Sequence, residues 1–371
     1  MDKEIKICFV VHNFADYGGV GVVAANLADA FAERYSVSLV SLLDDGRPAA
    51  YPLADRVRYI KLLRGEFRLR NQQRKLFKKI RLMLKKEEIN VAVILGHYTG
   101  FLMSPVRPFV KTRFVFCDHG ALMNQWDDRK NRAMRRLSAM VCDKVITLTE
   151  RTKEDYIKRF HMRRDRVDCI YNWIDQELSE PETYDIQSKR IVSAGRFGIE
   201  KGFDLMVRIF EIVVRRHPDW HLDLYGDGEM FDEVDAYVRE HNLSENVHLM
   251  GFYDNVREVF GKYAFYVMPS YREGLPVVLL EAKCCRLPIV SFDILTGPGE
   301  IIRDGIDGLL IPPYDTECFA DAVSFLMDNP EKRKEMSGHS QENLNLFSRE
   351  TIFRQWEQLI LSLADRHGRR E

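Results

Sequence analysis

The sequence predicts an α/β protein built from two Rossmann-like domains, each with a doubly wound parallel sheet. Short runs of β-branched and aromatic residues alternate with helical patterns, and this alternation restarts near residue 190. The length of 371 residues suits two domains. Because helices cover both faces of a parallel sheet, its strands are expected to be continuously apolar, as these runs are.

The first half opens with a strand over Ile5–Val11, a turn with Gly18 and Gly19, and a helix whose apolar face starts at Val20. This order is typical of the start of a Rossmann-like domain. A long basic helix is predicted over residues 67–88. The other strands predicted in this half are Val37–Leu42, Val91–Leu95, Phe114–Phe116, Lys144–Leu148 and Val167–Ile170.

The second half follows a predicted linker at Glu180-Pro181-Glu182 and repeats the pattern. A strand over Arg190–Ala194 leads into a loop, Gly195–Gly202, and then into a helix that begins near Phe203. Ligands of doubly wound sheets bind beyond the carboxyl ends of the strands, so the loops there are candidate sites. Further strands are predicted at His221–Tyr225, Val247–Met250, Phe265–Met268, Ile289–Phe292 and Leu309–Ile311.

Composition excludes several classes of protein. The longest apolar runs, such as Val91–Leu95, fall far short of the roughly 18 residues that span a bilayer. The apolar stretch Ile7–Val11 is too short for a signal peptide. Seven cysteines without a Cys-x-x-Cys pair favour reduced, buried thiols over a disulfide framework. We therefore expect a cytoplasmic protein.

Charge is distributed unevenly along the chain. Residues 1–170 hold 33 Lys and Arg against 20 Asp and Glu, a balance of +13, and the remainder has a balance of −14. A basic half predicts an anionic partner, either nucleic acid, phospholipid headgroups or a phosphorylated acceptor. Nucleic acid is disfavoured because no aromatic interleaving and no nucleic-acid-binding motif accompany the charge.

The most informative motif is Glu273-Gly274-Leu275-Pro276-Val277-Val278-Leu279-Leu280-Glu281. Pro276 suits the first turn of a helix, which places Glu273 in the preceding loop and Glu281 inside the helix. The free amides of residues 274–278 then form an anion site, with a carboxylate on either side that can accept hydrogen bonds from sugar hydroxyls. An ordinary helix N-terminus with one acid near the dipole and another on the surface remains an alternative.

A second motif is the loop Gly195-Arg196-Phe197-Gly198-Ile199-Glu200-Lys201-Gly202. Its glycines allow a sharp turn and a close approach to a ligand. Arg196 and Lys201 can neutralise a diphosphate, the first as a bidentate donor and the second as a point charge. A solvated basic loop is the alternative interpretation.

These two motifs, in this order and roughly 80 residues apart, resemble the family 4 retaining glycosyltransferases, or glycosyl transferases group 1. Members of that family have the GT-B fold, in which two Rossmann-like domains face a central cleft. The resemblance extends over nearly the whole chain. Tyr225-Gly226-Asp227-Gly228-Glu229 resembles the Gly-rich turn of the family, and Gly251-Phe252 lies where its nucleobase pocket is expected.

The resemblance also implies the domain limits. Tyr171-Asn172-Trp173-Ile174-Asp175 resembles the segment that ends the N-terminal domain, although Trp173 replaces the usual glycine. Residues 1–178 are therefore expected to form an acceptor-binding domain and residues 179–348 a nucleotide-sugar-binding domain. Arg349–Leu359 resembles the closing helix, so that residues 349–371 rejoin the first domain.

Roles for single residues follow from the same resemblance. Arg196 and Lys201 would bind the diphosphate, Glu281 the ribose and Glu273 the sugar, while His119 resembles the active-site histidine of the family. A cap or core histidine is the alternative for His119. The predicted catalytic residues are thus His119, Glu273, Arg196 and Lys201. The predicted donor contacts are Gly18, Gly19, Arg196, Lys201, Gly226, Phe252, Glu273, Gly274, Leu275, Pro276, Val277 and Glu281.

The expected mechanism uses no metal and no resident cofactor. The sequence contains no Asp-x-Asp pair, and Asp227-Gly228-Glu229 is interpreted as part of a structural turn. Arg196, Lys201 and helix amides would then stabilise the leaving diphosphate. The resemblance favours front-face attack with retention, in which the leaving phosphate oxygen takes the proton of the acceptor.

The resemblance implies transfer of a hexose or N-acetylhexosamine from a nucleotide-diphosphate sugar to a glycan, with UDP preferred on family frequency. Residues 56–86 contain 13 Lys and Arg and one acid, Glu66, and a second basic cluster comprises Arg129, Lys130, Arg132, Arg135 and Arg136. The helix within the first stretch carries an apolar stripe of Leu69, Leu76, Phe77, Ile80, Met83 and Leu84. A lipid-diphosphate-linked glycan at an anionic inner leaflet, in bacterial surface polysaccharide biosynthesis, would explain both clusters. An ordinary domain helix, with its apolar side packed inward and its cationic side solvated, is the alternative.

Two other classes of function remain open. A sugar-nucleotide epimerase or a phosphorylase can share the fold; the first would release an altered sugar nucleotide without an acceptor, and no signature of a phosphorylase cofactor lysine is present. A non-catalytic sugar-nucleotide-binding protein would bind donor without turnover. An assay for free nucleotide diphosphate separates these classes.

Overall fold

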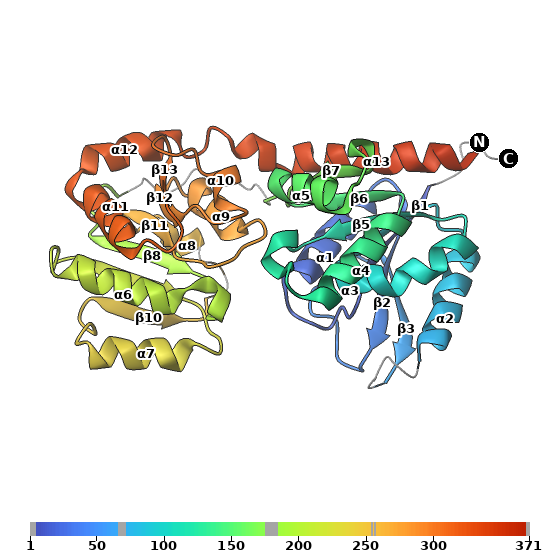
Figure 1. The fold of residues 1–371 in the computed structure, drawn as a ribbon, viewed down its shortest axis with the longest axis horizontal. Coiled ribbons are helices and arrows are strands. Elements are labelled where there is room, and N and C mark those ends of the chain that lie inside the picture. Colours follow the sequence, from blue (N-terminus) through green and yellow to red (C-terminus); the bar gives the residue numbers. More distant parts are fainter. Residues whose placement is uncertain (1–4, 66–71, 175–184, 254, 256, 369–371) are drawn as a thin grey trace. The chain divides into compact units, whose positions relative to one another are not determined.

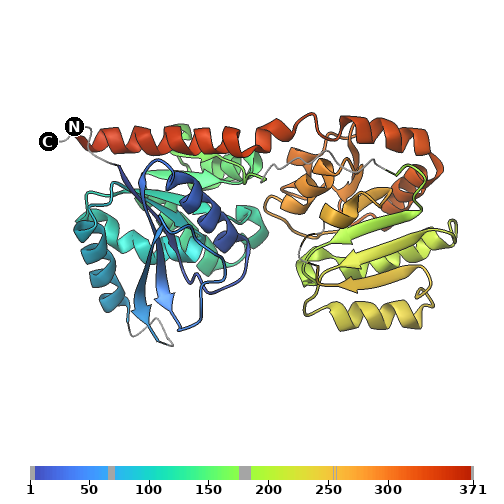
Figure 2. The same ribbon diagram turned by 180° about the vertical axis from the view of Figure 1, so that it is seen from behind.

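The computed structural model describes residues 5–65, 72–174, 185–253, 255 and 257–368. The chain divides into two compact units, Met1–Asn172 with Glu350–Glu371, and Trp173–Arg349. Each unit is a parallel sheet with helices on its faces, which confirms the predicted fold class (Figures 1 and 2). The predicted linker Glu180–Glu182 and the predicted boundary after residue 178 lie outside the described residues.

The N-terminal unit contains a seven-stranded parallel sheet in the order β3-β2-β1-β4-β5-β6-β7. Its strands are β1 (Lys6–Val11), β2 (Ser36–Asp44), β3 (Arg58–Arg64), β4 (Val91–Leu95), β5 (Arg113–Asp118), β6 (Lys144–Thr147) and β7 (Val167–Cys169). Its helices are α1 (Gly19–Phe31), α2 (Gln73–Lys86), α3 (His97–Met103), α4 (Arg129–Val141), α5 (Glu150–Phe160) and α13 (Arg349–Gly368), with 3-10 segments η2 (Ser104–Phe109), η3 (Leu122–Gln125) and η4 (Arg164–Arg166).

Helices cover both faces of this sheet. α2, α3 and α4 lie on the face turned toward the viewer in Figure 1, and α1 lies on the opposite face, in front in Figure 2. Helix α13 packs next to α1, where the rings of Phe31 and Phe353 are 4.6 Å apart. Every residue of β4 is buried, as its apolar sequence predicts.

The C-terminal unit contains a six-stranded parallel sheet in the order β10-β9-β8-β11-β12-β13. Its strands are β8 (Arg190–Ala194), β9 (His221–Tyr225), β10 (Val247–Gly251), β11 (Phe265–Met268), β12 (Ile289–Phe292) and β13 (Gly308–Ile311). Its helices are α6 (Phe203–Val214), α7 (Phe231–Glu240), α8 (Arg257–Phe260), α9 (Val277–Cys284), α10 (Pro298–Ile301), α11 (Thr316–Asp328) and α12 (Pro330–His339), with η5 (Ile199–Lys201) and η6 (Leu344–Phe347).

Three sequence predictions need correction. Strand β3 was not predicted, because its three cations Arg58, Lys61 and Arg64 interrupt the apolar residues and place it in a stretch interpreted only as basic. The predicted helix over 67–88 is described from Gln73 to Lys86; residues 67–71, with Leu69, lie outside the described residues. Pro276 precedes the helix as its N-cap, in an extended conformation, rather than lying in its first turn.

The second basic cluster is also corrected. Arg135 is buried and donates a hydrogen bond of 2.8 Å from Nε to Asp118, so it is a core ion pair rather than a surface charge. Arg132 lies over the ring of Trp126 and donates to its carbonyl oxygen. Arg129, Lys130 and Arg136 remain exposed. None of the helices within the described residues has the length and apolarity needed to cross a membrane.

Candidate functional site

The loop after β8 carries the predicted cations and is supported by the Gly-rich turn after β9. A side chain at Gly226, which has φ 136°, would overlap the carbonyl oxygen of Gly195. The Phe197 amide donates to the Asp227 carbonyl oxygen at 2.9 Å. Asp227 also accepts a hydrogen bond from the Gly228 amide at 2.7 Å. The turn therefore fixes the path of the loop that leads to Arg196 and Lys201.

Lys201 and Glu273 form an ion pair. Lys201 Nζ lies 2.8 Å from Glu273 Oε1, and Ser270 Oγ donates to the same oxygen at 2.8 Å. Gly202 follows Lys201 with φ 67°, where a side chain would overlap the carbonyl oxygen of Pro269. This close approach brings the loop after β8 against the segment after β11. Two motifs that are 72 residues apart in sequence thus meet at the carboxyl edge of one sheet.

Arg196 is largely exposed and pairs with Glu200. Its Nη2 atom lies 2.7 Å from Glu200 Oε1. The hydrogen bond to Glu200 raises the pKa of Arg196 above its ordinary value. Burial opposes ionisation of Glu200, but the hydrogen bonds from Arg196 and from a backbone amide, together with the charges of Arg196 and Lys201, outweigh it and lower the pKa of Glu200. Both side chains are therefore charged at neutral pH, and a diphosphate bound at this loop would compete with Glu200 for Arg196.

The segment before α9 is held in place by a neighbouring loop. Thr296 Oγ1 donates to the Glu273 carbonyl oxygen at 2.7 Å. Gly297 has φ 102°, and a Cβ there would lie 2.6 Å from Pro276 Cδ and 2.9 Å from the Gly274 oxygen. The predicted contacts Gly274 and Val277 are half-buried and Leu275 is buried. The amino end of α9 is thus a fixed group of amides beside Glu273.

Glu281 lies half-buried in the middle of α9. Two residues further on, the buried Lys283 Nζ contacts Asp307 at 2.8 Å and donates to the Ile301 carbonyl oxygen at 3.0 Å. These bonds tie α9 to the neighbouring part of its unit. Lys283 therefore has a structural role: it holds α9, and with it the position of Glu281.

Tyr266 of β11 belongs to the site but was not identified from the sequence. Its buried hydroxyl donates to the Ala194 carbonyl oxygen at 2.9 Å and accepts from the Ala194 amide at 3.0 Å. Burial, together with the charges of Glu273 and Glu281, raises the pKa of Tyr266. The hydroxyl stays protonated and completes the hydrogen bonding at the end of β8, directly before the cationic loop.

Phe252 follows β10 and is 72% exposed. Gly251, with φ 73°, turns the chain there, and its carbonyl oxygen accepts a hydrogen bond from the Gly226 amide at 2.8 Å. The backbone directly before Phe252 is therefore held by a hydrogen bond to the Gly-rich turn.

In the N-terminal unit, Gly18 is the N-cap of α1 and Gly19 its first residue, and no atom lies within 4 Å of a Cβ built on either residue. The Gly18 amide donates to Tyr51 Oη at 2.8 Å. This leaves the backbone at the start of α1 open to a ligand.

His119 follows β5, next to a buried network centred on Asp118. Asp118 accepts hydrogen bonds from Arg135 at 2.8 Å and from the Tyr156 hydroxyl at 2.7 Å. His119 Nε2 is buried, without a hydrogen-bond partner among the described residues. Burial lowers the pKa of His119 to about 4, so its imidazole is neutral at pH 7. The network was not predicted, since its three members are distant in sequence.

Comparison with protein families decides the family. Residues 17–178 match the family model described as Glycosyltransferase Family 4, and residues 175–342 match the model described as Glycosyl transferases group 1. The chain is a family 4 glycosyltransferase.

Two glycosyltransferases are similar to this chain over different shares of their length. The enzyme is 27% identical over 364 residues to the amylovoran biosynthesis glycosyltransferase AmsD of Erwinia amylovora, which covers 96% of this chain and 99% of the relative. It is also similar to the N-acetylgalactosamine-N,N'-diacetylbacillosaminyl-diphospho-undecaprenol 4-alpha-N-acetylgalactosaminyltransferase of Campylobacter jejuni. That match is 27% identical over 252 residues and covers 66% of this chain and 68% of the relative.

Solved structures support the GT-B fold of the glycosyltransferase. Sucrose-phosphate synthase from Thermosynechococcus elongatus superposes with a TM-score of 0.84 at 19% identity, covering 97% of this chain and 99% of that one. Anabaena Alr3699/HepE in complex with UDP and glucose superposes with a TM-score of 0.80 at 16% identity, covering 96% and 100%.

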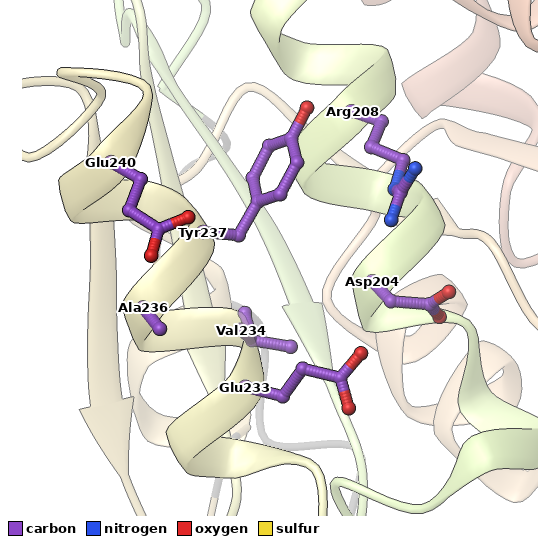
Figure 3. A pocket seen from close by; sticks show the side chains of 7 residues that line it. All are labelled: Asp204, Arg208, Glu233, Val234, Ala236, Tyr237 and Glu240. Carbon is purple, nitrogen blue, oxygen red and sulfur yellow. The ribbon is translucent and has the colours of Figure 1, made fainter.

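A separate pocket of the glycosyltransferase, with a volume of about 180 Å³, lies between α6 and α7 (Figure 3). Its charged lining residues are Asp204, Glu233, Glu240 and Arg208. Arg208 lies over the ring of Tyr237, 5.2 Å from its centroid. Three carboxylates against one cation do not suit a diphosphate, and none of the predicted donor contacts lines this pocket. Among the described residues, no group of three or more His, Cys, Asp or Glu is arranged to hold a metal ion.

Proposed function

We propose that this enzyme transfers a hexose or N-acetylhexosamine from a UDP-sugar to a lipid-linked glycan, with retention and without a metal, in bacterial surface polysaccharide biosynthesis. The observation that carries the proposal is the group of Lys201, Glu273 and the amino end of α9, with Arg196 on the same loop as Lys201. It combines two cations, helix amides and a carboxylate at the carboxyl edge of a parallel sheet, where nucleotides bind in doubly wound folds.

In the proposed mechanism, charge builds up on the leaving diphosphate. Lys201, Arg196 and the amides before α9 stabilise this charge, and each such contact lowers the barrier by roughly 2–4 kcal/mol. Glu273 holds the sugar and Glu281 the ribose hydroxyls. The acceptor hydroxyl attacks from the face that the diphosphate leaves, and its proton passes to the leaving phosphate oxygen. Neutral His119 serves as a hydrogen-bond partner of the sugar and not as a cation.

The substrate classes rest on the relatives. UDP is named in the Alr3699/HepE complex, amylovoran biosynthesis in the name of AmsD, and a diphospho-undecaprenol acceptor in the name of the Campylobacter jejuni enzyme. The similarity to AmsD over almost the whole of both chains supports a polysaccharide pathway.

We also propose that the enzyme acts on the inner face of the cell membrane as a peripheral protein. Helix α2 contains seven Lys and Arg and no acid. Each cation close to an anionic membrane contributes about 1 kcal/mol to attachment. A lipid-linked acceptor would be met at this surface.

The test is a donor screen with UDP-, GDP- and ADP-sugars that measures free nucleotide diphosphate with and without EDTA. Release from a UDP-sugar that continues in EDTA supports the proposal. Loss of release in EDTA, restored by Mn²⁺, overturns the metal-independent mechanism. NMR of the product gives the anomeric coupling constant, and a β-linkage from an α-linked donor overturns retention. Conversion of the donor to another UDP-sugar, without release, would instead identify an epimerase.

A further inference from the structure

The outer surface of one helical layer of the N-terminal unit contains exposed apolar side chains among cations. Helices α2 and α4 lie on the same face of the sheet, and η2 lies between them in contact with both (Figure 1). None of these three segments contains Asp or Glu. Single exposed apolar residues are common on protein surfaces, but here several are grouped on three neighbouring segments without acids.

Helix α2 exposes Leu82 at the centre of its cationic side. Leu82 is 67% exposed. On a helix its neighbours at spacings of three and four residues are Lys78, Lys79, Lys85 and Lys86, and all four are exposed. The opposite side of α2 is buried through Leu76, Ile80, Met83 and Leu84. Leu82 is therefore not part of the core stripe, and it faces outward where the charge is highest.

Phe109 ends η2, next to α2. Its ring is 54% exposed and lies 5.5 Å from the ring of Phe77, with the Arg81 guanidinium 5.9 Å from its centroid. Segments that lie in a membrane interface combine Phe, Leu or Trp with Lys and Arg in this way.

Helix α4 repeats the combination on the other side of η2. Its exposed residues include Arg129, Lys130 and Arg136 together with Leu137 and Met140, which are 39% and 60% exposed. Exposed cations and apolar side chains are thus mixed on α4 as they are on α2.

We propose that α2, η2 and α4 form a face that inserts into an anionic bilayer, with Leu82, Phe109 and Met140 entering the apolar boundary while the surrounding lysines and arginines contact the headgroups. An apolar side chain that leaves water for lipid gains roughly 25 cal/mol per Å² of buried area, and cations add electrostatic attraction to anionic headgroups. This inference rests on the proposed membrane attachment, but it requires more than charge.

The test is flotation with phosphatidylglycerol vesicles and with neutral phosphatidylcholine vesicles at low and high salt. The triple variant Leu82→Gln, Phe109→Gln, Met140→Gln keeps every charge. We expect its partition into anionic vesicles to fall at least ten-fold at low salt. The matched control, Ile306→Gln, Phe325→Gln, Leu346→Gln, replaces similarly exposed residues of the C-terminal unit and should bind like the wild type. In 1 M salt the wild type should keep part of its binding and the triple variant none.

The possible failures are distinguishable. If the apolar triple variant binds like the wild type while Lys75→Glu with Lys78→Glu abolishes binding, attachment is electrostatic only and insertion is wrong. If both variants bind like the wild type, the face does not contact membrane and both proposals fail. A salt-sensitive dimer in lipid-free solution that the apolar triple variant disrupts, without vesicle binding, would assign the face to contacts between copies of the chain.

Insertion depth gives a second measurement. Phe109→Trp should show fluorescence quenching by lipids brominated along the acyl chain, beyond that of the wild type, which has tryptophans of its own. Phe325→Trp in the C-terminal unit is the control and should show no added quenching. Equal quenching in the two variants would contradict insertion through η2.

Discussion

Lys201 Nζ lies 2.8 Å from Glu273 Oε1, so the cation proposed for the diphosphate and the carboxylate proposed for the sugar are in direct contact. Glu273 is mostly buried and also accepts a hydrogen bond from Ser270. In the proposed mode of donor binding, the contact would hold Lys201 beside the bond that joins the diphosphate to the sugar. Arg196, by contrast, is paired at the surface with Glu200 and has to be recruited by the ligand.

We expect Lys201→Ala and Arg196→Ala each to lower turnover more than ten-fold, because each removes positive charge from the developing diphosphate. Steady-state kinetics with the preferred donor measure this effect. Arg215→Ala is the matched control for Arg196, since Arg215 forms a similar exposed pair with Glu211 at the same spacing. Turnover near that of the control in either variant would refute the assigned role.

Substitution of the two glutamates of the site should affect donor binding and turnover differently. Glu281→Ala should mainly weaken donor binding, because the ribose stays bound throughout the reaction. Glu273→Ala should mainly lower turnover, since its sugar contact bears on the reacting centre. Calorimetric titration with the donor, beside a rate assay, tells binding from turnover. The reverse pattern would exchange the two roles.

Much of the fold follows from the sequence because its strands are locally distinct. Continuous apolar runs such as Val91–Leu95 and Phe265–Met268 predict strands with the observed bounds. Strand β3 was not predicted because it is an edge strand with few buried residues, and the charged residues Arg58, Lys61 and Arg64 interrupt its apolar positions.

Other features depend on contacts that no local pattern contains. Arg135 resembles its exposed neighbours on α4, and only the fold brings it to Asp118 on β5. Tyr266 lies in an apolar run and resembles a core aromatic, and its polar role exists only because β11 pairs with β8.

Glycine substitutions should distinguish packing from ligand approach. A Cβ at Gly19 meets nothing within 4 Å, so Gly19→Val should fold normally. If the donor or acceptor approaches this backbone, activity should fall at least ten-fold with an unchanged melting temperature. Gly226→Ala should instead destabilise the protein, because its Cβ would overlap the Gly195 carbonyl oxygen. Normal activity of Gly19→Val would remove this segment from the site.

His119 should make the enzyme sensitive to acid. Its pKa is lowered from an ordinary value near 6.5 to about 4, so between these pH values the unfolded chain binds a proton that the folded chain does not. Stability should therefore fall as the pH drops from 6.5 toward 4. Between pH 7 and pH 5 the contribution of His119 is about 1–2 kcal/mol.

Denaturant titrations of the wild type and of His119→Gln at the two pH values test this effect. Gln cannot ionise, so the variant should lose less stability on acidification. The buried His12 and His97 also have lowered pKa values, but they contribute equally to both proteins. An identical acid dependence of the two proteins would mean that His119 titrates normally.

Tyr266→Phe should weaken donor binding through the backbone. The variant keeps the ring but removes the only atom that bonds both the Ala194 amide and the Ala194 carbonyl oxygen at the root of the cationic loop. Unsatisfied buried groups cost about 1–3 kcal/mol of stability. Because the loop that begins at Gly195 positions Lys201, we also expect at least a five-fold rise in the donor KM.

Tyr263→Phe is the matched control: its buried hydroxyl bonds Asp223 and Tyr225, so a similar loss of stability is expected without a change in KM. Equal kinetics for the two variants would make Tyr266 a structural residue only.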